Sequence, residues 1–388
     1  MRVLMLADVP ANPDSGAAGT EYQTIAALRR GGHDVDAVWA DALPHRIKHW
    51  NLHYLFELPF AYRREMLSRM KSKDYDVVHV NQPHGYLAAK ALHQLKSRAV
   101  FIHRSHGFEL RVDADLKPWR EEYDRDTRGS LRKSISSVVS GGLAHNARKI
   151  ARFADGHIVS ASQCRDFLRE QMHVPPERIA VIPQAPANSF LGKTDLPMTS
   201  QRLRRVLYVG QFVFFKAPMI LAEVINRLSS ADEEMEFTWV CSKEHHKRVT
   251  EMLSAIARSR LRLLDWVQQD ELIEVYDSHG IFLFPSFFEG FGKVFLEAMS
   301  RGLCVVAANN SGALDVITDG EDGLLTPTGD VDAMTSGCLR LAGNLDDANR
   351  ISHAAAETAL SYTWDRVAGE TVAFYQNRLD ARARELAL

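Results

Sequence analysis

Cysteine is scarce in this sequence. Only Cys164, Cys241, Cys304 and Cys338 occur among 388 residues, and no two of them form a CxxC pair. Zinc sites and dithiol redox centres built on cysteine need closely spaced thiols, so the spacing argues against both. Each cysteine has apolar neighbours, and we expect four buried free thiols in a reducing compartment.

Long apolar runs are missing as well. No stretch approaches the roughly 18 uninterrupted apolar residues that a membrane-spanning helix needs. The apolar run at the amino terminus is broken at Asp8 and Pro10, which is too early for a signal peptide. These absences predict a cytoplasmic protein.

A surplus of positive charge is also absent. The sequence has 47 Lys and Arg against 49 Asp and Glu, and its formal net charge is −2. Proteins that bind nucleic acids usually carry a visible basic surplus, so we expect no nucleic-acid partner. No GxGxxG follows the first strand-like run and no GxxxxGK[ST] occurs, so nicotinamide and P-loop sites have no support.

The sequence does contain a regular alternation of short apolar runs and longer amphipathic runs. Runs of Val, Ile and Leu, each followed by a helical pattern, indicate parallel sheets covered on both faces. The alternation occurs twice, which predicts an α/β protein with two doubly wound, Rossmann-like domains. We predict strands at 3–6, 34–38, 76–80, 99–103, 157–159, 179–182, 205–209, 237–241, 261–264, 281–284, 304–307 and 324–326.

The same alternation sets the expected domain boundaries. Residues 191–201 contain turn formers and no periodicity, so we predict a linker there. An N-terminal domain would then cover residues 1–190 and a C-terminal domain residues 202–363. The last helical run, residues 364–388, follows the last predicted strand, and its packing on the N-terminal domain stays open.

One segment, residues 46–71, departs from this alternation. It mixes Arg and Lys with five aromatic residues, Trp50, Tyr54, Phe56, Phe60 and Tyr62. A basic helix with aromatic residues can lie on an anionic membrane surface. The alternative is a solvated helix that packs its rings on the sheet, and we favour it because Pro59 interrupts the periodicity. Peripheral contact with the inner face of a membrane stays open.

The most informative motif is PSFFEGFGKV at residues 285–294, which follows a predicted buried strand and leads into a predicted helix. Glycines at such a turn let a ligand approach the backbone, and the free N–H groups of a helix start suit a diphosphate. Glu289 precedes the helix, and Glu297 lies about a turn and a half inside it. Each carboxylate can accept two hydroxyl hydrogen bonds, so the pair suits the sugar and ribose ends of one elongated ligand. The alternative is a tight turn with solvent-facing glutamates.

Glu289, seven residues and then Glu297, with PSFFEGFG before and EAMSRG after, resemble the signature of retaining GT-B glycosyltransferases of family 4. The resemblance implies that Glu289 contacts the transferred sugar and that Glu297 holds the nucleotide ribose. The implied fold is GT-B, in which two Rossmann-like domains face each other across a cleft. The residues whose backbone would meet the phosphates are Gly290, Phe291, Gly292, Lys293 and Val294.

The loop GQFVFFKAP at residues 210–218 resembles the segment in which that family clamps the donor diphosphate with an Arg and a Lys. Lys216 matches the lysine, whose ammonium would neutralise charge on the leaving group. Gln211 stands where the arginine is expected, and it lacks the charge and the bidentate fork of Arg. This departure calls donor affinity, or activity itself, into question.

Two segments of the N-terminal half extend the resemblance. Residues 14–21 resemble the family's N-terminal glycine loop, where Gly16 and Gly19 would let the sugar or acceptor come close. Thr20 has capping-box spacing to Gln23, so we predict that a helix starts there, with an ordinary βα turn as the alternative. His106 resembles the family's histidine that reaches the donor sugar from the opposite domain; a histidine satisfied within its loop is the alternative.

Metal ions and cofactors are not expected. The chain has five DxD triplets, a chance-like number, and the resemblance implies catalysis without a metal. The nucleotide sugar would act as a co-substrate.

These motifs together imply a retaining, metal-independent glycosyltransferase that moves a sugar from a nucleoside-diphosphate sugar to a glycan, lipid-linked or small-molecule acceptor. The predicted catalytic residues are His106, Glu289 and Lys216. Gly16, Gly19, Gln211, residues 290–294 and Glu297 are the predicted donor-binding residues. Two alternatives stay open: a catalytically silent GT-B partner or scaffold, and a GT-B sugar-nucleotide epimerase or phosphorylase.

Overall fold

The structure is a computed structural model that describes residues 1–13, 16–105, 109–123, 130–192 and 196–387. The chain divides into two compact units, of which the first comprises Met1–Gln184 with Trp364–Leu388 and the second Ala185–Thr363. The division after Gln184 lies six residues before the end that the sequence analysis gave to the first domain. Phe190 explains the difference, because its ring packs at 5.5 Å on Tyr276 in the core of the second unit.

The first unit is built on a six-stranded sheet in the order β2-β1-β3-β4-β5-β6, in which neighbouring strands run parallel. β3 and β4 are buried along their whole length, as expected for strands covered on both faces. The strands are β1 (Arg2–Leu6), β2 (Asp34–Val38), β3 (Val77–Asn81), β4 (Val100–Arg104), β5 (Gly156–Val159) and β6 (Ile179–Val181).

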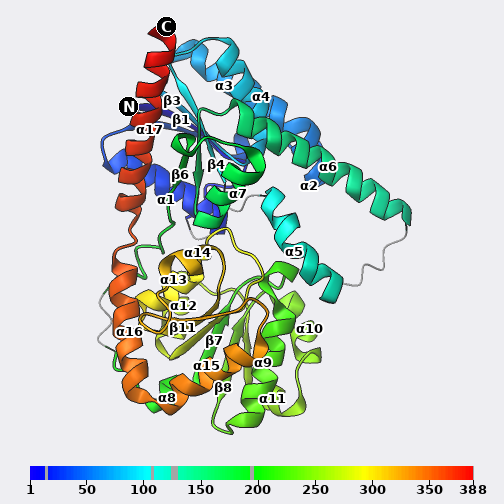
Figure 1. The fold of residues 1–388 in the computed structure, drawn as a ribbon, viewed down its shortest axis with the longest axis vertical. Helices are drawn as coiled ribbons and strands as arrows, with labels where there is room; N and C mark the ends of the chain where they lie inside the picture. The colour runs from blue at the N-terminus through cyan, green and yellow to red at the C-terminus, as the bar shows by residue number, and fades with distance from the viewer. Residues whose placement is uncertain (14–15, 106–108, 124–129, 193–195, 388) are drawn as a thin grey trace. The chain divides into compact units, whose positions relative to one another are not determined.

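Helices cover both faces of this sheet (Figure 1). α1 and α17 pack together on one face, and α3, α4 and α6 pack together on the other. Tyr375 of α17 is fully buried, and its hydroxyl contacts His79 of β3. The helices are α1 (Gly16–Arg30), α2 (Trp50–Leu52), α3 (Leu58–Ser72), α4 (Tyr86–Gln94), α5 (Glu109–Tyr123), α6 (Ser130–Phe153), α7 (Ser162–Met172) and α17 (Trp364–Ala387).

The second unit repeats the architecture with a six-stranded sheet in the order β12-β11-β10-β7-β8-β9, again with parallel neighbours. The central strands β10 and β11 are continuous apolar runs that are buried at every residue. The strands are β7 (Arg205–Val209), β8 (Glu236–Val240), β9 (Leu261–Leu264), β10 (Ile281–Phe284), β11 (Cys304–Ala308) and β12 (Leu324–Thr326).

The helices of the second unit follow its strands, and two of them show why they begin where they do. α9 has Pro218 in its first turn, where the missing N–H costs nothing. α15 begins after Asp330, whose side chain accepts a hydrogen bond from the N–H of Ala333 at 2.9 Å. The helices are α8 (Ser200–Leu203), α9 (Pro218–Ala231), α10 (His246–Glu251), α11 (Ala255–Ser259), α12 (Gln269–Asp277), α13 (Lys293–Ser300), α14 (Ser311–Val316), α15 (Val331–Gly343) and α16 (Leu345–Leu360).

The predicted fold class is confirmed, and each of the twelve predicted strands is present with its ends within one residue. The prediction of four buried free thiols is confirmed as well. No helix among the described residues is long and apolar enough to cross a membrane.

Two local predictions are wrong. α1 begins at Gly16, so Thr20 is not an N-cap; its hydroxyl instead donates to the carbonyl of Gly16 at 3.1 Å, within the helix. Pro59 does not interrupt the helical segment, because it lies in the first turn of α3, directly after a π-helical turn at His53–Glu57.

The aromatic residues of this segment divide between the core and solvent. Tyr62 is fully buried, whereas Trp50, Phe56 and Phe60 are each more than half exposed. The favoured interpretation, a solvated helix that packs its aromatic residues on the sheet, is therefore wrong for these three rings.

In each sheet the strand order reverses at one position: the chain first adds one or more strands on one side of its first strand and then adds the remaining strands on the other side. The reversal lies between β1 and β3 in the first unit and between β7 and β10 in the second. Loops that leave the carboxyl ends of two such strands diverge to opposite faces of the sheet, and ligands of doubly wound proteins bind in the crevice that opens there. These two positions are where functional side chains are expected.

Candidate functional site

Two loops of the second unit meet at the carboxyl ends of β7 and β10. The first runs from Gly210 to Ala217 and the second from Pro285 to Gly292. They are joined through the backbone, because the N–H groups of Phe287 and Phe288 both point to the carbonyl of Phe215, at 2.9 and 3.3 Å. The chain reversal thus places segments about 70 residues apart in one hydrogen-bonded unit.

Lys216 and Glu289 form an ion pair at the centre of this unit. Nζ of Lys216 lies 2.5 Å from Oε1 of Glu289, and both side chains are largely buried. Ser286 adds a second donor, since its hydroxyl lies 2.8 Å from the same carboxylate oxygen. Nζ also lies 6.0 Å from the ring centroid of Phe284, within the range of a cation–π contact. Removing either charge would leave the other buried without its partner.

Backbone strain accompanies this ion pair. Ala217, directly after Lys216, has φ +52°, and Ser311, whose hydroxyl lies 3.3 Å from the N–H of Glu289, has φ +51°. Residues other than glycine seldom adopt such values, which persist only where the surrounding structure holds them. One strained residue follows Lys216 in the chain and the other contacts the backbone of Glu289, so the strain marks this position as a site candidate.

The turn into α13 depends on glycine. Gly292 has φ +97°, and a Cβ atom built on it would lie 2.4 Å from the ring of Phe284. Because only glycine fits, the backbone can pass over the ring and start α13 at Lys293. The helix begins directly after the loop that carries Glu289, so its positive dipole end lies at this loop and favours an anion there.

Glu297 lies on α13, one turn after its start. The hydroxyl of Tyr276, a fully buried residue of α12, donates to Oε2 of Glu297 at 3.1 Å. Burial raises the pKa of Glu297, while the charge of Lys293 and the Tyr276 hydrogen bond act in the opposite direction. The carboxylate is therefore held in one orientation by a neutral donor and keeps acceptor capacity for a ligand.

The predicted site residues fall into three groups. Lys216 and Glu289 are in contact in the second unit, residues 290–294 lead from Glu289 into α13, Glu297 lies on α13, and Gln211 is exposed at the start of the loop after β7. Gly16 and Gly19 lie in the first unit, on the first turn of α1, where Gly16 is exposed and Gly19 is buried. His106 lies outside the described residues.

Sequence reasoning missed the residues that support the charged pair. Besides Ser286 and Ser311, Asn310 donates through Nδ2 to the carbonyl of Ser286 at 2.7 Å and to the hydroxyl of Thr328 at 3.2 Å. Asn310 follows β11, the strand next to β10, so its position after a predicted strand was a usable signal.

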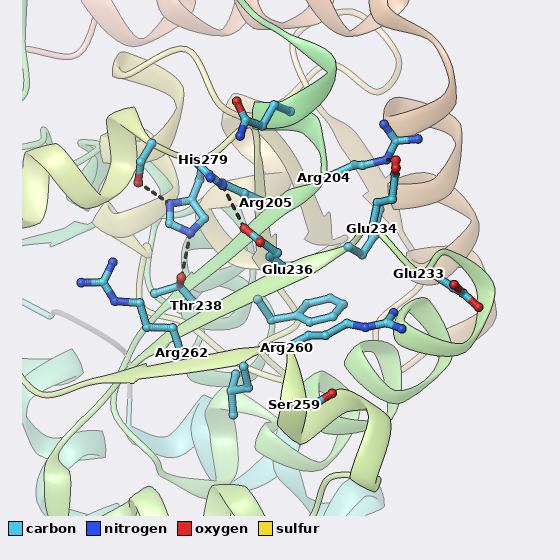
Figure 2. Close-up of a pocket in the computed structure, with 15 residues that line it drawn as sticks. Arg204, Arg205, Glu233, Glu234, Glu236, Thr238, Ser259, Arg260, Arg262 and His279 are labelled. Atoms are coloured by element: carbon cyan, nitrogen blue, oxygen red, sulfur yellow. Dashed lines mark hydrogen bonds and ion pairs between the residues drawn. The ribbon is translucent and has the colours of Figure 1, made fainter.

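A separate hollow of about 900 Å³ lies at the opposite edge of the same sheet (Figure 2). It is lined by residues at the amino ends of β7, β8 and β9, among them paired charges such as Arg205 and Glu236 at 3.0 Å. His279 lines it too and is tied to Thr238 at 2.8 Å. Because ligands of doubly wound domains bind at the carboxyl ends of the strands, we do not place the site in this hollow.

Two known protein families match segments that together make up most of the chain. Residues 204–344 match the family described as glycosyl transferases group 1, and residues 15–185 match the family described as glycosyltransferase family 4. The second match spans most of the first structural unit, and the first spans most of the second.

Individual relatives carry related names. D-inositol 3-phosphate glycosyltransferase of Corynebacterium glutamicum is 25% identical over 343 residues, which are 82% of this chain and 77% of that protein. Proteins of the same name from Corynebacterium diphtheriae and Corynebacterium efficiens are matched over 56% and 60% of their lengths. The sulfoquinovosyl transferase of Arabidopsis thaliana is 31% identical over 162 residues, which are 41% of this chain and 30% of that protein.

Solved structures share the fold at low sequence identity. Sucrose-phosphate synthase from Thermosynechococcus elongatus superimposes with a TM-score of 0.76 at 17% identity, covering 98% of this chain and all of that one. Anabaena HepE in complex with UDP superimposes with a TM-score of 0.69, also at 17% identity, covering 96% of this chain and 99% of that one.

Proposed function

The chain belongs to glycosyltransferase family 4, the glycosyl transferases of group 1, and on that premise we propose that its second unit binds the donor diphosphate with Lys216 and the start of α13. The chain has the GT-B fold. It is a retaining glycosyltransferase that takes its sugar from a nucleotide sugar. The proposal assigns the steps of that reaction to residues of this chain.

The ion pair of Lys216 and Glu289 at the carboxyl ends of β7 and β10 carries the proposal. An apo protein would need a counter-ion for a lysine held this close to a diphosphate site, and Glu289 supplies it. A bound diphosphate would take over the ammonium and release the carboxylate to accept hydrogen bonds from sugar hydroxyls. The pair is therefore a resting arrangement of two groups with separate tasks.

The other residues extend this site along the donor. The N–H groups at the start of α13 would meet the phosphates. Glu297, oriented by Tyr276, would accept hydrogen bonds from the ribose hydroxyls. We assign Gly16, Gly19 and His106 of the first unit to the sugar and acceptor side, as the family pattern implies.

The chemistry is a same-face displacement without a covalent intermediate. The bond between the anomeric carbon and the diphosphate oxygen breaks, and its electron pair goes to the phosphate. The acceptor hydroxyl attacks the same face of the anomeric carbon and passes its proton to the departing phosphate oxygen. Lys216 and the helix start stabilise the charge that develops there, so the transfer step needs no metal ion.

We propose a uridine diphosphate sugar as the donor. HepE, which shares the fold, has been solved with UDP and with UDP-glucose, and this makes uridine the first base to test. The acceptor is a glycan, a lipid-linked or a small-molecule hydroxyl compound, and the exposed Trp50, Phe56 and Phe60 are compatible with a lipid-linked one.

Thermal unfolding against a nucleotide panel tests the proposal. The purified chain is heated with UDP, GDP, ADP and their common sugar conjugates, each with and without a chelator. A ligand at about 100 times its dissociation constant stabilises the folded state by about 2.7 kcal/mol. We expect UDP and UDP-sugars to raise the midpoint temperature of unfolding, and by the same amount with and without the chelator. No shift with any nucleotide would contradict the donor site.

A further inference from the structure

Three metal-ligating side chains meet at the chain reversal of the first unit. Asp8 follows β1, His45 lies in the loop after β2, and His53 begins the π-helical turn before α3. One ligand atom of each lies within 4.8 Å of the other two. Nε2 of His45 is 2.8 Å from Oδ1 of Asp8, and Nε2 of His53 is 3.4 Å from Oδ2. None of the three has a part in the proposed transfer reaction.

The hydrogen bonds on the far sides of the imidazole rings fix which nitrogen carries a proton. Nδ1 of His45 lies 3.1 Å from the carbonyl oxygen of Leu43, and Nδ1 of His53 lies 2.9 Å from Oε2 of Glu57. Both oxygens can only accept, so each Nδ1 is the donor. In a neutral imidazole the lone pair then sits on Nε2, the atom that faces Asp8.

When both histidines are neutral, the lone pairs on their Nε2 atoms face the lone pairs of the Asp8 carboxylate. The side chains of Asp8 and His53 are fully buried, and no described residue provides a hydrogen-bond partner for Oδ2 of Asp8 or Nε2 of His53. The two imidazole rings are also stacked, with centroids 4.7 Å apart, so placing a positive charge on both would be unfavourable. One cation between the three ligand atoms satisfies all of them.

The same features match a metal centre in detail. A metal-bound histidine commonly donates its other ring N–H to a carboxylate or a backbone carbonyl, and here one histidine does each. Bonds of about 2.1 Å around a tetrahedral ion place ligand atoms about 3.4 Å apart, which is the separation of Nε2 of His53 from Oδ2 of Asp8, and the three ligand atoms all lie within 4.8 Å of one another. A divalent ion would also balance the charges of Asp8 and Glu57.

We propose that Asp8, His45 and His53 bind one divalent transition-metal ion, with Zn²⁺ the best match to two imidazoles and a carboxylate. Magnesium prefers all-oxygen ligands, so it fits this set poorly. Three protein ligands leave the fourth position of a tetrahedral ion open for water or another oxygen ligand. The side chain of His45 is 34% exposed, so an ion reaches the site from solvent on that side. The centre ties the segment that carries α2 and α3 to the end of β1.

Metal binding to the untagged full-length chain tests this proposal. The protein is stripped with a chelator, titrated with Zn²⁺ against a chromogenic chelator, and analysed for metal content after dialysis. We expect one Zn²⁺ per chain. His45→Ala and Asp8→Asn should each lower the affinity at least about 100-fold, because losing a ligand costs no less than losing a residue that orients one.

His49→Ala is the matched control, because His49 is exposed and lies four residues from His45. It should bind Zn²⁺ like the wild type, and circular dichroism checks that every variant is folded. The proposal is overturned if Zn²⁺ does not bind the wild type, or if Zn²⁺ binds both ligand variants as tightly as it binds the wild type. In that case protons, and not a metal ion, satisfy the hydrogen-bonding atoms of Asp8, His45 and His53. UDP binding with and without chelator stays a separate readout, so failure here is distinguishable from failure of the donor site.

Discussion

Gln211 stands where the resemblance leads us to expect the arginine of the donor clamp. It is exposed at the start of the β7 loop that ends at Lys216. An amide at this position can donate to a phosphate, but it brings no charge and cannot form the bidentate ion pair that a guanidinium makes with a phosphate.

Gln211→Arg should therefore tighten UDP binding, by about tenfold if the fork reaches the diphosphate. Isothermal titration with UDP measures the change. Gln211→Lys is the matched control, since it restores the charge without the fork and should give a smaller gain. Unchanged affinity in both variants would mean that Gln211 does not face the phosphates.

Tyr276 allows a test of the ribose assignment. Its hydroxyl holds Oε2 of Glu297 at 3.1 Å. Tyr276→Phe removes this donor with little change in shape, so Glu297 loses its fixed orientation. We expect UDP to bind several-fold more weakly and the preference for UDP over its 2′,3′-dideoxy analogue to shrink. Competition binding with both nucleotides measures that preference, and an undiminished preference would place Glu297 away from the ribose.

Glu289, Glu297 and Lys216 were chosen from motifs, and their roles stay predictions. The fold places Lys216 and Glu289 in contact and Glu297 on α13. Ser286 and Asn310 were missed, although Asn310 follows a predicted strand, because their partners depend on how loops from β10 and β11 meet. The cluster of Asp8, His45 and His53 was missed for the same reason: its members come from three elements with no common spacing.

Among helices and strands, the strands were the most predictable elements. Short continuous apolar runs such as Ile281–Phe284, each followed by a helical pattern, are typical of parallel strands covered on both faces, and this alternation identified them. Helix starts were less predictable. α1 begins four residues before the capping-box position, and the hydroxyl of Thr20 contacts the carbonyl of Gly16 and Oε1 of Gln184 instead of capping the helix. Pro59 looked like a breaker, although proline is well tolerated in a first turn.

The start of α13 offers a test at one backbone position. Gly292→Ala adds a methyl group that meets the Phe284 ring at a φ that alanine rarely adopts. We expect the turn to shift, UDP binding to fall at least tenfold and stability to fall by about 1–3 kcal/mol. Isothermal titration and urea unfolding measure the two effects.

Gly343→Ala is the control for that substitution. Gly343 ends α15, and a Cβ there meets nothing within 4 Å. It should leave UDP binding unchanged and stability the same or slightly higher. If Gly292→Ala and Gly343→Ala had the same UDP affinity and the same stability, the turn into α13 would not need glycine.

For the molecule as a whole, buried neutral histidines in both units predict how stability depends on pH. Burial lowers the pKa of His157 in the first unit to about 3 and that of His279 in the second to about 4. Both values lie below the ordinary 6.5, so the unfolded chain binds more protons. The stability that these groups contribute is complete above pH 6.5 and is lost as the pH falls toward 4, by about 1.4 kcal/mol per unit and per histidine.

Urea unfolding at pH 7.5, 6 and 5 measures this trend. We expect the midpoint to fall steadily with pH in the wild type. His279→Gln removes one titrating group from the second unit, so its midpoint should be lower at pH 7.5 but should fall less between pH 6 and 5. A parallel pH dependence in the two proteins would mean that His279 is not held neutral.

We propose that Lys216 binds the donor diphosphate and that Glu289 binds the sugar. UDP binding to three proteins tests these separate roles most directly. Isothermal titration at pH 7.5 compares the wild type with Lys216→Ala and Glu289→Ala. Loss of the ammonium should weaken UDP binding about 10- to 100-fold. Loss of Glu289 should leave UDP affinity unchanged or higher, because it frees Lys216 and touches only the sugar end, while donor turnover disappears. Weaker UDP binding in Glu289→Ala together with unchanged binding in Lys216→Ala would contradict the assignment.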